Sequence, residues 1–187
     1  MFEIMVDLDG VICNMIGGYE KALGIKADPW PMPGEYWACT ALNLPEDVVE
    51  AVMVPYEFWA NLNPYPYAHK FIQWLEDGYG QENVFFLTKP KDTKECWGGK
   101  FTWVQKNFPS YTHKLLTGVP KYCTAHSNSY LIDDCDENCD MFLAKGGNPI
   151  MFPQPWNRKH KLSNQKFEVV RQELISKIGV QLPEFKL

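Results

Sequence analysis

Short runs of apolar residues, each followed by polar or turn residues, recur along the chain. They cover residues 2–6, 84–87, 130–132 and 150–152. None of them alternates cleanly between apolar and polar side chains, as a strand with one solvated face would. Short continuous apolar runs are typical of strands buried on both faces of a parallel sheet. The pattern therefore predicts strands of this kind at all these places.

Between these runs, apolar side chains recur at the three- and four-residue spacing of an amphipathic helix. The spacing predicts helices over residues 68–75, 101–108 and 167–178. Gly78 and Gly179 stand where the first and the last of these helices would end, since glycine is common just beyond a helix. Strands that alternate with helices indicate an α/β sandwich of three layers, in which helices flank a parallel sheet.

Residues 15–65 break this alternation, because prolines and tryptophans are concentrated there. Short helical patterns within this stretch cover residues 17–23, 45–52 and 56–61. We therefore expect a small helical insertion after the first strand rather than a second full domain. The main domain would then be built from residues 1–14 and 66–187.

The composition suits a single folded domain. With 187 residues, 45% of them apolar, the chain can bury a core of that size. The formal net charge of -5 argues against a stable nucleic-acid partner, because a nucleic-acid-coating surface needs an excess of lysine and arginine. No apolar run reaches the roughly 18 residues of a membrane-spanning helix, so we expect no membrane partner.

The cysteines and the first residues point to a reducing compartment. Six cysteines are too few and too scattered for a disulfide-stabilised scaffold of this length. Cys135 and Cys139 are close in sequence, but no CxxC pair or matching histidine accompanies them, so a zinc site is not favoured. The chain begins without the basic and apolar segments of a secretory signal. We therefore expect free thiols and a cytoplasmic protein.

Pairs of carboxylates follow two of the predicted strands. Asp7 and Asp9 come directly after the first apolar run, and Asp133 and Asp134 directly follow the third. The carboxyl ends of parallel strands meet at one edge of a sheet, where ligands bind in open α/β folds. Each pair alone could be an acidic turn, but four carboxylates at two strand ends can hold a hard divalent cation such as Mg²⁺.

Hydroxyl and ammonium groups complement these carboxylates. Thr88 and Lys89 end the second predicted strand, and Lys121 precedes the second acidic pair. A divalent cation, a carboxylate nucleophile, a hydroxyl and a lysine together make up the chemistry of phosphoryl transfer. The combination predicts a phosphoryl-transfer site at this edge of the sheet.

The ordered set of these segments resembles the four motifs of the haloacid dehalogenase-like phosphohydrolase superfamily. A narrower resemblance, over roughly residues 2–160, is to the 5'(3')-deoxyribonucleotidases, the pyrimidine-type cytosolic type C 5'-nucleotidases. The segments that carry it are residues 7–11, 86–90, 99–106, 115–117, Lys121, residues 131–134 and Asn157. The resemblance implies a Rossmann-like fold with a small helical cap formed by residues 15–65.

The resemblance also implies a role for each acidic residue. Asp7 would be the nucleophile that forms an aspartyl-phosphate, and Asp9 would be the general acid and then the general base. Mg²⁺ would be held by Asp7, by the backbone carbonyl of Asp9, and by Asp133 and Asp134. Within the last pair we favour Asp134 as the direct ligand.

The same resemblance names the groups that would bind the phosphate. Thr88 and Lys121 are the principal candidates, and Lys100 is a further candidate by its position in the motif, although it could also be a solvated helix residue. Lys89 stands where the family usually has a small residue, so it either contacts phosphate or points outward. Residues 119–120 replace a charged pair that is common in the family, which leaves the substrate specificity open.

Aromatic residues of the expected cap are candidates for contact with a nucleobase. Phe58 and Trp59 could stack on a base, because a flat aromatic face accepts any base. The alternative is that they form the core of the cap itself, and the same two interpretations apply to Trp30 and Trp37.

The leading hypothesis is therefore a Mg²⁺-dependent phosphomonoesterase that acts on a small-molecule substrate, a nucleoside monophosphate. Both 5'- and 3'-deoxyribonucleotides fit the resemblance. One alternative keeps the chemistry but changes the substrate to another small phosphate ester or to a nucleic-acid 3'-phosphate end. A second alternative is a non-catalytic phosphate-binding module. For the assembly, a homodimer is the state we consider beside a monomer.

Overall fold

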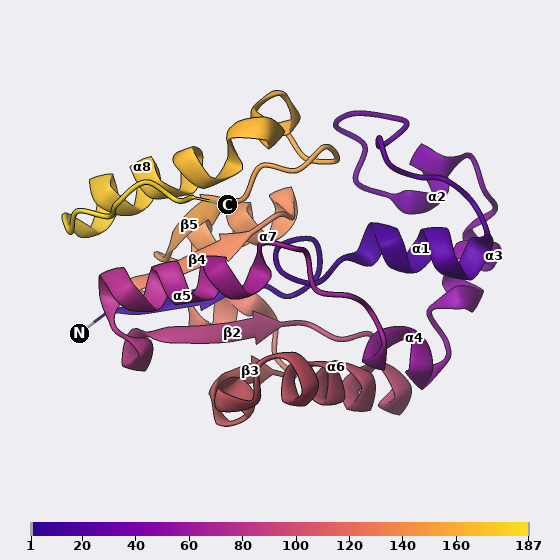
Figure 1. Cartoon of the computed structure of the whole chain (residues 1–187), viewed down its shortest axis with the longest axis horizontal. Coiled ribbons are helices and arrows are strands. Elements are labelled where there is room, and N and C mark those ends of the chain that lie inside the picture. Colours follow the sequence, from indigo (N-terminus) through magenta and orange to yellow (C-terminus); the bar gives the residue numbers. More distant parts are fainter. Residues whose placement is uncertain (1, 187) are drawn as a thin grey trace.

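One sheet of parallel strands forms the centre of the protein (Figure 1). The computed structural model describes residues 2–186. The strand order is β3-β2-β1-β4-β5, and every neighbouring pair is parallel. The strands are β1 (Glu3–Val6), β2 (Val84–Thr88), β3 (Leu115–Thr117), β4 (Ser129–Asp133) and β5 (Asn148–Met151). The two acidic pairs therefore follow strands that are direct neighbours, β1 and β4.

Helices cover both faces of the sheet. The longer ones are α5 (Ala68–Tyr79), α6 (Lys94–Asn107), α7 (Asp136–Ala144) and α8 (Lys166–Ile178). Ile4 and Val6 of β1 share a large apolar core with α5, α6 and α8, whereas Met5 between them belongs to a smaller core with Phe142 of α7. These layers confirm the predicted α/β fold. No helix within residues 2–186 has the length and apolar character needed to span a membrane.

The predicted elements are present, with shifted ends and some omissions. All the predicted strands occur, but β3, at one edge of the sheet, was not predicted. Neither were the largely polar α7 and the short helix Ala38–Leu42. Gly78 lies inside α5 instead of beyond it, because the helix continues to Tyr79 and Gly80 takes the positive φ of 85° at its end. The helix predicted over residues 101–108 begins earlier, at Lys94, and Thr93 caps it by accepting a hydrogen bond from the Cys96 amide.

The stretch 15–65 consists of short helices beside the carboxyl ends of the strands (Figure 1). These helices are α1 (Met15–Leu23), α2 (Ala38–Leu42), α3 (Glu46–Val52) and α4 (Tyr56–Ala60). The chain enters and leaves this stretch side by side, because Asn14 and Tyr65 donate backbone hydrogen bonds to Asn63 and Ile12. This pairing places the helices next to the edge of the sheet that carries the acidic residues.

Helix α4 packs closely on α6 because α6 has a glycine at the crossing point. A Cβ atom on Gly99 would lie 2.4 Å from Cβ of Trp59 and 2.9 Å from the carbonyl oxygen of Tyr56. The Trp103 indole reinforces the contact by donating to the Leu62 carbonyl over 2.8 Å. The close approach of the two helices fixes the position of the residue after Gly99, which is Lys100.

We predict that Gly99→Ala lowers the free energy of unfolding, although alanine is the better helix former. Overpacking costs about 1–3 kcal/mol, and contacts as short as those at Gly99 place the cost above the roughly 1 kcal/mol that alanine gains in helix propensity. Gly98→Ala is the matched control, because a Cβ there would lie 3.5 Å from the Tyr56 ring, an ordinary contact. Urea unfolding should show Gly99→Ala less stable and Gly98→Ala at least as stable as the wild type; equal stabilities of the two variants would contradict the close-packing argument.

Candidate active site

Three buried aspartates converge at the carboxyl edge of the sheet. Asp7 follows β1, Asp133 ends β4, and Asp134 comes next; each is at most 6% exposed. One carboxylate oxygen from each lies within 4.8 Å of the others. Within residues 2–186 this is the one group of acidic, histidine or cysteine side chains close enough together to hold a metal ion.

Lys121 joins two of these carboxylates. Its ammonium lies 2.7 Å from Oδ1 of Asp7 and 2.6 Å from Oδ2 of Asp133, and its side chain is 3% exposed. A short 3-10 turn, Lys121–Thr124, brings the lysine to this position. Burial lowers the pKa of Lys121, but the attraction of Asp133 and Asp7 outweighs that effect and raises it, so the ammonium stays charged.

Asp133 is held by donors on both of its oxygens. The Cys135 amide donates to Oδ1 over 2.8 Å, and the Asn138 amide group lies 3.3 Å from Oδ1 and 3.2 Å from Oδ2. Together with Lys121 these contacts fix Asp133 in place. The carboxylates of Asp7 and Asp134 have fewer such contacts.

Asp134 packs between a glycine and a tryptophan. The Trp156 indole donates to Oδ2 of Asp134 over 2.6 Å, and the Asn157 amide group donates to the backbone carbonyl of Asp134 over 2.8 Å. On the other side, a Cβ atom on Gly10 would lie 2.0 Å from the same Oδ2. Gly10 also has a φ of 75°, so both its backbone and its missing side chain make room for Asp134.

The charges of this cluster do not balance within the protein. Asp7, Asp133 and Asp134 are three carboxylates around one ammonium, so two negative charges are uncompensated. Burial, aided by the neighbouring carboxylates Asp133 and Asp9, raises the pKa of Asp7 to about 7 despite the attraction of Lys121. Burial and repulsion from the carboxylates of Asp133 and Asp7 raise the pKa of Asp134. One hard divalent cation would compensate these two negative charges, and carboxylate oxygens are suitable ligands for such a cation.

Asp9 and Thr88 are linked by a buried lysine from α6. The Lys100 ammonium pairs with Oδ2 of Asp9 and donates to the Thr88 hydroxyl over 2.9 Å, and its side chain is 5% exposed. Lys100 is therefore a buried residue of the site and not a solvated helix residue. Oδ1 of Asp9 is buried and has no hydrogen-bond partner among the described residues.

A cavity of about 420 Å³ opens onto these groups. Asp7, Asp9, Thr88 and Lys121 all line it. Lys89 also lines it, but with an exposed side chain. The structure thus brings all the predicted catalytic and phosphate-binding residues to one place.

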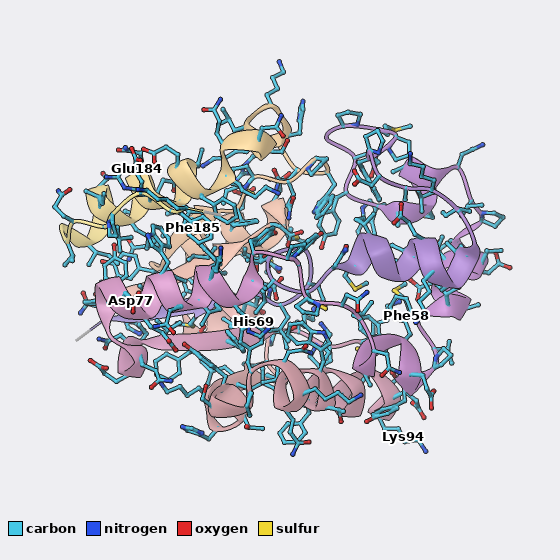
Figure 2. The ribbon with its side chains drawn as sticks, viewed as in Figure 1. Phe58, His69, Asp77, Lys94, Glu184 and Phe185 are labelled. Carbon is cyan, nitrogen blue, oxygen red and sulfur yellow. The ribbon has the colours of Figure 1, made fainter. Side chains whose placement is uncertain are left out.

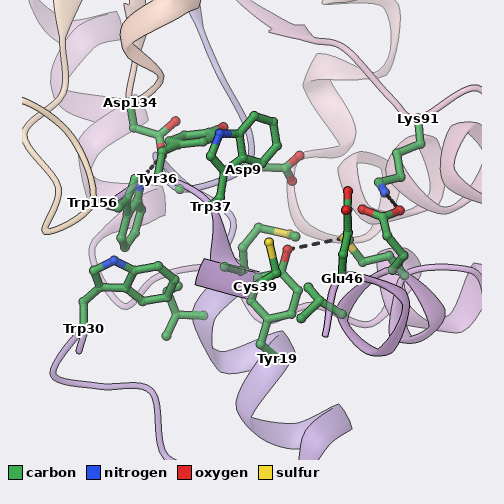
Figure 3. Close-up of a pocket in the computed structure, with 17 residues that line it drawn as sticks. Asp9, Tyr19, Trp30, Tyr36, Trp37, Cys39, Glu46, Lys91, Asp134 and Trp156 are labelled. Carbon is green, nitrogen blue, oxygen red and sulfur yellow. Dashed lines mark hydrogen bonds and ion pairs between the residues drawn. The ribbon is translucent and has the colours of Figure 1, made fainter. Parts of the chain in front are cut away.

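A second cavity, of about 230 Å³, adjoins the first (Figure 3). Trp30, Tyr36, Trp37 and Trp156 form its aromatic wall, and Asp9 lies at its edge. Tyr36 and Trp37 line both cavities. Burial and the nearby Asp134 raise the pKa of the Tyr36 phenol, so its hydroxyl remains protonated and can donate a hydrogen bond.

The far side of this second cavity is charged. Glu46 and Glu50 of α3 line it together with Lys91, and Lys91 pairs with Glu50 (Figure 3). This ion pair joins α3 to the loop that follows β2.

Phe58 and Trp59 lie outside the residues that line either cavity. Trp59 is 3% exposed, and its indole donates to the Met53 carbonyl over 2.7 Å. Phe58, labelled in Figure 2, packs edge-on against Trp59 at a ring distance of 5.2 Å. Both side chains serve the packing among the short helices, which was the alternative interpretation from the sequence.

Some residues of the site were not predicted. Gln154 and Trp156 belong to no recognised motif, so no role was predicted for them. They lie beside Asn157 in the turn that follows β5. Tyr36 was not predicted either, whereas its neighbour Trp37 was among the aromatic candidates for base contact; both lie in a proline-rich loop, where the sequence does not reveal which way a side chain points. The structure shows that Trp37 is 65% exposed and lines both cavities.

Comparisons with known proteins agree with this geometry. The family model described as 5' nucleotidase, deoxy (Pyrimidine), cytosolic type C matches residues 1–175. Proteins of two Staphylococcus epidermidis strains, each named "Putative 5'(3')-deoxyribonucleotidase", are 25% identical over 173 residues, which is 90% of this chain and 89% of the relative.

A solved structure supports the fold. A hydrolase of the haloacid dehalogenase-like family from Streptococcus pneumoniae superposes with a TM-score of 0.51 at 14% identity. The match covers 88% of this chain and 90% of that one. The family match confirms the narrower resemblance: the chain belongs to the deoxy (pyrimidine), cytosolic type C 5'-nucleotidase family, a group of hydrolases.

Proposed function

We propose that this protein is a Mg²⁺-dependent nucleotidase that hydrolyses deoxyribonucleoside monophosphates through an aspartyl-phosphate on Asp7. The observation that carries the proposal is the buried Lys121, which bridges Asp7 and Asp133 at the floor of one cavity. An aromatic-walled second cavity begins beside it. A phosphate at the first cavity would place its nucleoside in the second.

Asp7 is the proposed nucleophile because one of its oxygens is positioned by Lys121. Attack on phosphorus forms the bond between Asp7 and the phosphoryl group and breaks the bond to the nucleoside oxygen. Lys121 and the Thr88 hydroxyl would contact the transferring oxygens, where negative charge accumulates. Lys89, on the exposed rim of the same cavity, would meet the phosphate as it enters.

Asp9 is the proposed general acid and base. Its Oδ2 is held by Lys100, so its buried Oδ1, which has no partner among the described residues, is the oxygen available to the reaction. A proton on Oδ1 would pass to the leaving nucleoside oxygen. The resulting carboxylate would then take a proton from the water that hydrolyses the aspartyl-phosphate.

Asp7 and Asp134 are the proposed ligands of Mg²⁺, with Asp133 and the backbone carbonyl of Asp9 as further oxygen donors. The uncompensated charge of the cluster supports this assignment. When bound, the cation would screen the repulsion between the Asp7 carboxylate and the phosphate dianion.

Residues 15–65 are the proposed cap, and the substrate base is proposed to stack in the aromatic cavity. Trp37 is the principal candidate, since its indole is exposed and lines both cavities. The name of the Staphylococcus epidermidis relatives supports a deoxyribonucleotide as the substrate. Glu46 and Glu50 argue against a nucleic-acid 3'-end, because their carboxylates would repel a polyanionic chain.

The family description, which names a cytosolic type, supports a cytoplasmic enzyme of nucleotide breakdown. A homodimer stays a prediction, which light scattering of the purified protein would test.

Replacing the nucleophile should abolish turnover without unfolding the protein. Asp7→Asn is close in shape but a far weaker nucleophile, so we expect phosphate release to fall by about 10³-fold or more. Asp77→Asn is the control, because this exposed aspartate lies on α5 away from the site (Figure 2). Circular dichroism would establish that both variants fold. Wild-type activity of Asp7→Asn would refute the mechanism.

A substrate panel tests the proposed activity itself. Phosphate release would be measured with 5'- and 3'-deoxyribo- and ribonucleoside monophosphates, with sugar phosphates and with an aryl phosphate. We expect deoxyribonucleotides to turn over fastest, with activity lost in EDTA and restored by excess Mg²⁺. Selective hydrolysis of sugar phosphates would favour the alternative substrate class, and binding of phosphate without turnover would favour a non-catalytic module.

Loss of the exposed indole should weaken base recognition selectively. Stacking on one aromatic side chain contributes about 1–3 kcal/mol, so Trp37→Ala should raise KM for nucleoside monophosphates by about 10-fold. KM for a sugar phosphate, which has no base, should stay the same. Phe58→Leu is the contrasting variant: a larger KM effect there than at Trp37 would restore the interpretation made from the sequence.

A further inference from the structure

The turn after β5 touches both halves of the acidic site. We call residues 154–157 the clamp turn. The Gln154 amide group donates to the Gly10 carbonyl in the loop that follows Asp7, and Asn157 donates to the Asp134 carbonyl. Through these contacts the clamp turn holds the nucleophile loop and the end of β4 together.

Trp156 is the part of the clamp turn that reaches a carboxylate. Its indole is 7% exposed and donates to Oδ2 of Asp134 over 2.6 Å. Among the described residues, no other side chain donates to this carboxylate. The opposite side is closed by Gly10, where even a Cβ atom would collide with Oδ2. The indole therefore determines how the Asp134 carboxylate is oriented and leaves Oδ1 for a ligand.

The same clamp turn is the docking site for the loop between α1 and α2. The Trp30 ring meets the Trp156 ring in a T-shaped contact, with 5.6 Å between centroids and 66° between planes. Nearby, the Gly34 amide donates to the Pro155 carbonyl over 2.8 Å. Trp30 is 6% exposed and Trp156 is 7% exposed, so this contact is largely buried. The loop thus rests on the one indole that orients Asp134.

Trp30 itself donates its indole hydrogen bond away from the acidic cluster. Its own indole donates to the Glu35 carbonyl over 2.9 Å, which closes the loop on itself. The ring contact with Trp156 is therefore the direct connection from Trp30 to the Asp134 carboxylate. This separation lets the two tryptophans be tested independently.

We infer that Trp30 and Trp156 are positioning residues that couple docking of the loop between α1 and α2 to cation binding at Asp134. The inference rests on the proposed cation site and goes beyond it. When the loop is docked, the Trp156 ring is held between Trp30 and Asp134, and the carboxylate presents Oδ1 to the cation. When the loop is displaced, the ring can rotate and the carboxylate loses its one side-chain donor. Side chains that orient ligands in this way typically change metal affinity by about 10- to 100-fold.

The coupling has a consequence for the substrate. Trp30 and Trp156 both line the aromatic cavity that we assign to the nucleoside. A ligand seated there packs against the docked loop and stabilises it. Because coupling between two sites is reciprocal, the nucleoside and the cation should each increase the affinity of the protein for the other.

The experiment is direct titration of the intact protein with Mg²⁺ alone, by isothermal calorimetry, with no substrate present. Trp156→Phe keeps the ring and removes the N–H donor, and we expect its Kd for Mg²⁺ to rise by about 10-fold. Trp30→Leu removes the aromatic contact without touching a carboxylate, and its Kd should also rise. Trp30→Phe keeps an aromatic ring against Trp156 and should restore most of the affinity.

Trp103→Phe is the matched control, because it removes an indole donor that serves the Leu62 carbonyl instead of a carboxylate. Its Kd for Mg²⁺ should equal that of the wild type. Thermal unfolding without Mg²⁺ identifies any variant that is not folded at the titration temperature. In the folded variants, the rise in Tm that Mg²⁺ produces should be smaller for Trp156→Phe and Trp30→Leu than for the wild type.

The outcomes separate the inference from the proposed function. If the wild type binds Mg²⁺ and Trp156→Phe binds it equally well, the positioning role of Trp156 is refuted. If Trp156→Phe binds weakly but Trp30→Leu binds like the wild type, the coupling to the loop is refuted. A wild type that binds no Mg²⁺ would overturn the proposed cation site, and the coupling with it.

Discussion

The concentration of negative charge at one edge of the sheet is the constraint on which the rest of the site depends. Parallel pairing of β1 with β4 places Asp7, Asp133 and Asp134 together in a buried position, where like charges repel strongly. Lys121 offsets part of this repulsion by contacting two of the carboxylates at once. The remainder requires either protons or a cation. The proposed phosphoryl transfer fits that requirement, because positive charges that stabilise the carboxylates also attract a phosphate.

The surrounding structure supplies the aspartates with donors unequally. Asp133 has donors on both oxygens, so it serves as the fixed point to which Lys121 is anchored. Asp134 receives one side-chain donor, from Trp156, which the loop between α1 and α2 contacts in turn. Asp9 is held by Lys100, whose position depends on the close packing of α4 against α6 at Gly99. The positions of Asp9 and Asp134 thus depend on contacts that involve residues 15–65. These contacts connect the short helices and their loops to the acidic site.

Much of the fold and the polar half of the site could be predicted from the sequence, because both follow from strands that end in charged residues. Strand β3 could not, since it has three residues and two of them are exposed, so its apolar run is too short to be distinctive. Helix α7 has few apolar residues, and its burial depends mainly on Cys139 and Phe142. Among the aromatic residues, Trp59 and Trp37 are equivalent in sequence. One is buried by packing that involves α4 and α6 and the other is exposed at the site, and tertiary contacts alone decide which.

The unequal supply of hydrogen-bond donors also explains which of the aspartates have raised pKa values. The raised pKa values at Asp7 and Asp134 are expected for buried carboxylates with few donors, because burial disfavours their charged forms. These are the two residues that the proposed chemistry requires to respond, Asp7 as the proposed nucleophile and Asp134 as the proposed cation ligand. A carboxylate with donors on both oxygens, as Asp133 has, is less free to change its contacts. Because Asp7 and Asp134 receive few hydrogen bonds, they keep oxygens available for reaction. Lys121 orients Asp7, and Trp156 orients Asp134.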